Sequence, residues 1–129
     1  MKAATAAIQI CRAYDAAHAS GARLLVDRLW PRGVSKATLR LDDWIKEVAP
    51  SNDLRHWFHV DPVRGGEFRV RYVSELNHNS EPVAHCLVWC AKGPVTLLFA
   101  AHDSEHNNAV VLRDYLIACQ IKEHRKDGN

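Results

Sequence analysis

Four side chains that could bind a ligand or take part in catalysis follow an apolar run in the first third of this sequence. Asp27, Arg28, Trp30 and Arg32 come directly after Leu24-Leu25-Val26. Guanidinium groups are planar, forked donors that suit a phosphate or a carboxylate, and an indole ring can stack on a planar ligand. These residues therefore suggest a binding site for a small anion, with Asp27 orienting the two arginines. The structural alternatives are an internal ion pair and a tryptophan that packs in the core.

A second group, His102, Asp103, Glu105, His106 and Asn107, follows the apolar run 94–101. Histidine titrates near neutrality, so His106 oriented by Asp103 is a candidate proton donor and acceptor. A helix that begins here also offers free backbone N–H groups to an anion, beside His102 and Asn107. A metal held by the two histidines is disfavoured, because His102 precedes the helix. Helix capping by solvated polar side chains is the structural alternative.

A third group lies between two short helices and contains Arg55, Trp57, His59 and Asp61. Trp57 and His59 are expected to contact a ligand if this segment closes over the strand ends. In the structural alternative, Trp57 packs the helix interface while His59 and Asp61 cap the next helix.

The apolar patterns predict the elements that position these groups. Strands are predicted at 8–14, 23–29 and 95–101, the last two as runs buried on both faces of a parallel sheet. Helices are predicted at 43–48, 52–58, 62–76, 80–92 and 105–121, from caps, prolines and apolar stripes. The predicted fold is a small three-layer α/β domain, a short and mostly parallel sheet with helices on both faces. In such folds ligands bind at the carboxyl ends of the strands, which is where the first two groups lie.

Composition limits the class of protein. The 129 residues, 47% of them hydrophobic, predict one domain over residues 1–129 with frayed termini at 1–7 and 122–129. No apolar run reaches about 18 residues and no secretion signal is evident, so a cytoplasmic protein without a membrane span is expected. The four cysteines show no disulfide pattern, and Cys86 and Cys90 fall on an apolar helix stripe. The absence of phosphate-loop, dinucleotide and zinc motifs predicts no cofactor and no metal.

Several motifs resemble the YeaO-like branch of the domain of unknown function 488 family. They are "VDRLWPRG" at 26–33, "LDDW" at 41–44, "LRHWFHVDP" at 54–62 and "PVTLLFAAHDSEHNNAVVL" at 94–112. The resemblance implies a small cytosolic prokaryotic α/β protein and points to the same two strand ends. In the wider family, the junction between the second buried strand and the helix that follows it resembles an acidic residue followed by "Cys-His-Arg". The corresponding place here, after Asp103, holds no cysteine, which argues against a thiol mechanism.

Two functional hypotheses follow. The first is a hydrolase or group transferase acting on an anionic or nucleotide-like ligand at the strand ends, with Asp27, Asp103 and His106 as catalytic groups. The second is a non-catalytic module that binds an anion or a nucleic acid. The arginines available for nucleic acid are Arg28, Arg32, Arg55, Arg64, Arg69 and Arg71. The near-balanced net charge of +2 does not by itself favour nucleic acid.

Overall fold

The computed structural model describes residues 7–60, 65–103 and 107–127. Four parallel strands form one sheet in the order β1-β4-β2-β3. Their bounds are β1 Ile8–Arg12, β2 Ala22–Leu25, β3 Asp43–Trp44 and β4 Val95–Phe99. All five residues of β4, which lies between β1 and β2, are buried. The predicted small α/β domain with a parallel sheet is therefore confirmed.

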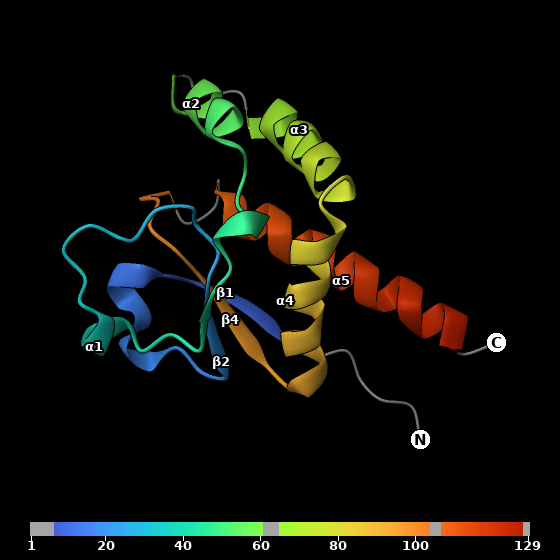
Figure 1. Cartoon of the computed structure of the whole chain (residues 1–129), viewed down its shortest axis with the longest axis horizontal. Coiled ribbons are helices and arrows are strands. Elements are labelled where there is room, and N and C mark those ends of the chain that lie inside the picture. The colour runs from blue at the N-terminus through green and yellow to red at the C-terminus, as the bar shows by residue number, and fades with distance from the viewer. Residues whose placement is uncertain (1–6, 61–64, 104–106, 128–129) are drawn as a thin grey trace.

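Helices cover both faces of the sheet (Figure 1). The α-helices are α1 Lys36–Leu39, α2 Asn52–Val60, α3 Gly65–Asn77, α4 Ser80–Lys92 and α5 Asn108–Asp127. Two 3₁₀ helices, η1 Ala13–His18 and η2 Lys46–Val48, complete the described elements. In Figure 1, α4 and α5 lie on one side of the strands and α1 on the other, while α2 and α3 extend beyond the sheet. Within the described ranges, no helix is both long and apolar enough to cross a bilayer.

Two hydrophobic clusters correspond to the two faces. The larger cluster packs alternate strand residues such as Leu24 and Leu97 against the apolar stripes of the longer helices, for example Tyr72 and Leu112. The smaller cluster packs Leu25 and Leu98 against η1 and α1, with Trp30 and Trp44 partly buried beside it. Because successive strand residues point to opposite faces, each continuous apolar run contributes side chains to both clusters.

The strands are shorter than predicted. β1 ends at Arg12, and η1 replaces the predicted end of that strand. β2 ends at Leu25, although the N–H of Val26 still donates to the carbonyl of Leu98 at 3.1 Å. β4 ends at Phe99, before the two alanines. Each of the three strands therefore ends earlier than predicted at its carboxyl end, where the polar groups follow.

The predicted helix at 43–48 was wrong. Asp43–Trp44 forms the edge strand β3, which pairs in parallel with β2 at Leu24 and Leu25, and only Lys46–Val48 is helical. Pairing with a sheet edge is a long-range contact that a local capping pattern does not reveal. The segment 34–41, which shows no strong pattern, contains the short helix α1 capped by the Ser35 hydroxyl.

The last helix begins and ends later than predicted. α5 spans Asn108–Asp127, so residues 122–127, assigned from the sequence to a frayed tail, are helical. The predicted cap at Asp61 lies outside the described residues. The helix at 80–92 is confirmed in its bounds.

Candidate functional site

The ends of β2 and β4 meet at the carboxylate of Asp27. Its Oδ2 accepts a hydrogen bond from the backbone N–H of Ala100 at 2.8 Å. Its Oδ1 accepts one from Nδ2 of Asn108 at 3.0 Å, and the same amide donates to the carbonyl of Val26 at 3.2 Å. The chain just after β2 is thus joined to the first residue after β4 and to the start of α5. The described residues of the two polar groups predicted from the sequence lie at one end of the sheet.

Burial raises the pKa of Asp27 above its ordinary value. The hydrogen bonds from Asn108 and Ala100 and the positive charge of Arg55 act in the opposite direction, because each stabilises the ionised form. The cost of desolvation exceeds these three contributions. A carboxyl group with a raised pKa at a strand end is typical of functional sites, although structural networks also produce it.

A pocket of about 590 Å³ opens at this end of the sheet. That volume lies in the range of small-molecule sites. Its polar lining includes seven of the predicted site residues: Asp27, Arg28, Trp30, Arg32, His102, Asp103 and Asn107. Its apolar and additional lining comes from Tyr14, Leu29, Pro31, Ala49, Pro50, Arg55, Phe58, Phe68, Ala100, Ala101 and Asn108.

Arg28 is held by backbone carbonyls rather than by Asp27. Its Nη2 donates to the carbonyl of Ala49 at 3.3 Å, and its Nε to that of Pro50 at 3.4 Å. The prediction that Asp27 orients Arg28 and Arg32 was wrong, because both Asp27 oxygens bind groups at the ends of β4 and α5 instead. These bonds attach the chain after β2 to the segment that leads into α2.

Arg32 lies exposed at the rim of the pocket. Its backbone carbonyl accepts a hydrogen bond from the Tyr14 hydroxyl at 3.0 Å. Its guanidinium makes no hydrogen bond or ion pair with the residues that the structure describes. The group is therefore available to an anion that enters from solvent.

Arg55 enters the pocket from α2, although the sequence does not assign it to the strand ends. Its Nη2 donates to Oδ1 of Asn52, one turn earlier, at 3.3 Å. Its Nε is buried and has no hydrogen-bond partner among the described residues. Its charge nevertheless lowers the pKa of Asp27, which places the two groups within electrostatic reach across the pocket.

Trp30 contributes to packing as well as to the pocket wall. Its indole N–H donates to the carbonyl of Val34 at 2.6 Å, and its ring meets that of Trp44 edge to face at 5.5 Å. The Trp44 indole N–H in turn donates to the carbonyl of Asp27 at 2.7 Å. The structural alternative therefore accounts for the position of Trp30, while stacking of its ring on a ligand stays a prediction.

In the second polar group, Asn107 caps α5 and His102 is exposed at the pocket. Asn107 is buried and caps α5, since its Oδ1 accepts from the N–H of Val110 at 3.1 Å. Its Nδ2 donates to the carbonyl of Asp103 at 2.9 Å. His102 is exposed, and its Nδ1 lies 3.3 Å from Nη2 of Arg12 at the end of β1. Glu105 and His106 lie outside the described residues, so the predicted proton transfer by His106 stays a prediction.

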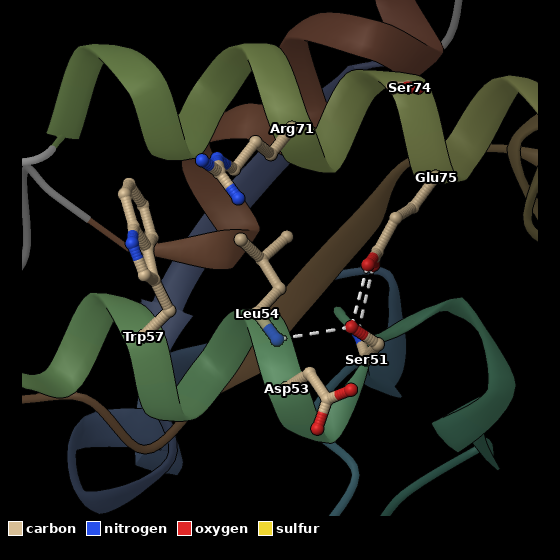
Figure 2. Close-up of a pocket in the computed structure, with 7 residues that line it drawn as sticks. All are labelled: Ser51, Asp53, Leu54, Trp57, Arg71, Ser74 and Glu75. Carbon is tan, nitrogen blue, oxygen red and sulfur yellow. Dashed lines mark hydrogen bonds between the residues drawn. The ribbon is translucent and has the colours of Figure 1, made fainter.

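Trp57 is not among the residues that line the strand-end pocket, and its predicted contact with a ligand stays a prediction. It lines a different hollow of about 520 Å³ between α2 and α3, where the Arg71 guanidinium lies 4.4 Å from its ring centroid (Figure 2). At the other end of this hollow, the Glu75 carboxylate accepts from the N–H and the hydroxyl of Ser51, which caps α2 (Figure 2). His59 belongs to α2, but its side chain lies outside what the structure describes.

The arginines proposed for nucleic acid do not form one free basic surface. Arg69 pairs with Asp114 at 3.1 Å, and Arg71 pairs with Glu67 at 2.6 Å. Arg64 lies outside the described residues. Of the set described, Arg28, Arg32 and Arg55 share a single location, the strand-end pocket.

Comparison with known proteins places this α/β domain in a family. The chain belongs to the family described as the inactive DUF488-N3 subclade, whose profile matches residues 7–129. It is 44% identical over 110 residues to the uncharacterized protein YeaO of Escherichia coli, covering 84% of this chain and 96% of that protein. It is 38% identical over 110 residues to the uncharacterized proteins Mb3100c of Mycobacterium bovis and Rv3073c of Mycobacterium tuberculosis, covering 84% of this chain and 92% of each. No solved structure gives a significant match.

Proposed function

We propose that this protein binds a small anion, without catalysis, in the pocket at the carboxyl ends of β2 and β4. The observation that carries this proposal is Arg55, whose Nε is buried in the pocket region without a hydrogen-bond partner in the described chain. A buried donor left unpaired costs about 1–3 kcal/mol, and more when it belongs to a charged group. An anion oxygen at this position would remove that cost.

Two further arginines that line the same pocket support the proposal. Arg28 uses its Nε and Nη2 on backbone carbonyls, and its Nη1 makes no hydrogen bond with the described residues. Arg32 offers an exposed guanidinium that the described residues leave unpaired. Three guanidinium groups around one hollow form a positive site that attracts anions, because each donates planar, charge-assisted hydrogen bonds.

Catalysis receives less support than binding. The family description calls this subclade inactive. Among the described lining residues there is no serine, threonine, cysteine or lysine to act as a nucleophile. Both oxygens of Asp27 already accept hydrogen bonds that join the strand ends.

The four cysteines are free thiols, which fits the bacterial cytoplasm as the location of the protein.

A thermal-shift screen of the purified chain tests the proposal. The probes are inorganic phosphate, sugar phosphates, nucleotides and small carboxylates. A probe at about 100 times its dissociation constant is expected to raise the melting temperature by about 8 °C or more. Arg55→Gln should abolish the shift, while Arg69→Gln, which removes an exposed arginine of α3 outside the pocket, should keep it. The proposal is wrong if no anion shifts the wild type, or if both variants respond equally.

Acid–base catalysis by Asp27 is the second candidate, favoured by its raised pKa in a pocket. A catalytic Asp27 predicts turnover of a bound ester or phosphoester probe that Asp27→Asn abolishes while ligand binding persists. A binding protein predicts that a bound probe is recovered unchanged after prolonged incubation.

A further inference from the structure

The charges that line the strand-end pocket nearly balance. Its described ionic side chains are three guanidinium groups, Arg28, Arg32 and Arg55, and two carboxylates, Asp27 and Asp103. These described groups sum to a formal charge of +1, since three positive charges face two negative ones. A ligand with one negative charge neutralises that excess. A second negative charge would face the Asp27 carboxylate at the same end of the pocket, and like charges repel strongly where water is scarce.

Two apolar side chains of the lining are open to solvent. Leu29 is 58% exposed and Tyr14 is 46% exposed, two of the large hydrophobic side chains that the fold leaves uncovered, and both line this pocket. Phe58 stacks on Phe68 with a centroid distance of 4.4 Å and forms another part of the lining. Apolar side chains around a few converging polar groups are typical of sites that take an organic molecule rather than a bare ion.

Arg55 and Phe58 come from the same helix at i and i+3, so they lie on one face of α2. The face that brings the unpaired guanidinium donor to the pocket therefore also brings an aromatic ring beside it. A ligand that meets the donor with its charged end would place its body against Phe58 and Leu29.

We infer that the ligand is an organic monoanion, a carboxylate carried on an aromatic or branched apolar body. Its two oxygens accept from Arg55, and its body covers Leu29 and Phe58. This inference rests on the proposed function and narrows it, since a phosphate dianion or an inorganic ion satisfies the anion site but not the charge balance or the apolar lining.

Calorimetric titration of the whole chain at pH 7.5 with matched probes tests the inference. Phenylacetate and isovalerate carry one charge and an apolar body, acetate lacks the body, 2-phenylethanol lacks the charge, and phenyl phosphate carries a second charge above its pKa near 6. We expect phenylacetate or isovalerate to bind at least tenfold more tightly than the other three probes. Leu29→Ser should remove most of the advantage over acetate, because it shortens an exposed side chain of the pocket. Val70→Ser, which changes a side chain that is 69% exposed and lies outside the pocket, should not.

The possible failures separate the two proposals. If phenyl phosphate or inorganic phosphate binds as tightly as the carboxylates, and Arg55→Gln abolishes that binding, the monoanion class is wrong and the anion pocket stands. If 2-phenylethanol binds as tightly as phenylacetate, or if no probe binds at 10 mM, the monoanion class is wrong, and the thermal-shift screen decides whether the anion pocket stands. If Leu29→Ser and Val70→Ser behave alike, the apolar body does not lie where we place it and the inference fails.

Discussion

Asp27 should make the protein less stable as the pH rises from about 4 toward neutrality. Its pKa is raised in the folded state, chiefly by burial, whereas the unfolded chain returns it to about 3.9. Below that value both states are protonated and the stabilising contribution is fully present. As the pH rises through the folded pKa, the unfolded state has already released its proton, so stability is lost at up to about 1.4 kcal/mol per pH unit.

Urea unfolding of the wild type and Asp27→Asn across pH 3.5 to 7.5 measures this contribution. The amide has one acceptor oxygen for two donors, the N–H of Ala100 and the amide of Asn108, so the variant also loses a hydrogen bond. That loss, about 1–3 kcal/mol, does not depend on titration of the site. The test is therefore the slope: the wild-type free energy of unfolding minus that of the variant should fall as the pH rises.

Asp43 provides a control of opposite sign. Burial raises its pKa, but hydrogen bonds from Trp89 and His85 and the charge of His85 outweigh burial and lower it overall. The stability difference between the wild type and Asp43→Asn should therefore fall as the pH drops through the folded pKa of Asp43. A difference for Asp27→Asn that rises with pH, as for Asp43→Asn, would show that hydrogen bonding outweighs burial at Asp27 and refute the reasoning.

Three further predictions concern the elements around the pocket. Glu75→Ala removes both hydrogen bonds to Ser51 at the start of α2. Because α2 positions Arg55, this change should weaken anion binding several-fold in calorimetry. An unchanged affinity would show that the cap of α2 does not affect the anion site. Tyr72→Phe deletes the buried hydrogen bond to the carbonyl of Val48 and should cost about 1–2 kcal/mol in urea unfolding, whereas a loss below about 0.3 kcal/mol would contradict that bond. Burial raises the pKa of Cys86 to about 12, so this thiol should resist alkylation by iodoacetamide at pH 8 until urea unfolds the chain, as mass spectrometry of the labelled peptides would show.

The sequence predicted the fold class and the position of two polar groups at strand ends because both depend on strong local signals. Buried apolar runs that end in polar residues define the strands, and the parallel arrangement follows from the intervening helices. The helix 80–92 was predicted in its bounds because a serine and proline open it and Gly93 closes it.

The edge strand and the start of α5 were missed for reasons that lie outside local pattern. Asp43 and Trp44 become a strand by pairing with β2, and the Trp44 indole also binds the Asp27 carbonyl, both long-range contacts. The sequence offers several polar side chains as caps of the last helix, and in the structure Asn107 performs that role. Several side chains can cap one helix, and only the path of the chain selects among them.

The sequence limits, but does not decide, which residue of α2 enters the strand-end pocket. Trp57 follows it by two residues on the same helix, and residues at i and i+2 do not share a face. Once α2 closes over the strand ends, only one of the two can enter the pocket. The structure brings Arg55 to the pocket and Trp57 to Arg71, but which face turns inward depends on how α2 packs on α3.

The most direct test of the anion pocket is the side-chain Nε–H signal of Arg55 in proton–nitrogen NMR spectra. The signal is assigned by its absence in Arg55→Lys, which keeps the charge but has no Nε–H, with Arg69 as an internal reference outside the pocket. The account predicts that titration with phenylacetate moves the Arg55 signal with saturation, at the dissociation constant found by calorimetry, while the Arg69 signal stays fixed. Binding seen by calorimetry with an unchanged Arg55 signal would contradict the central role given to this side chain.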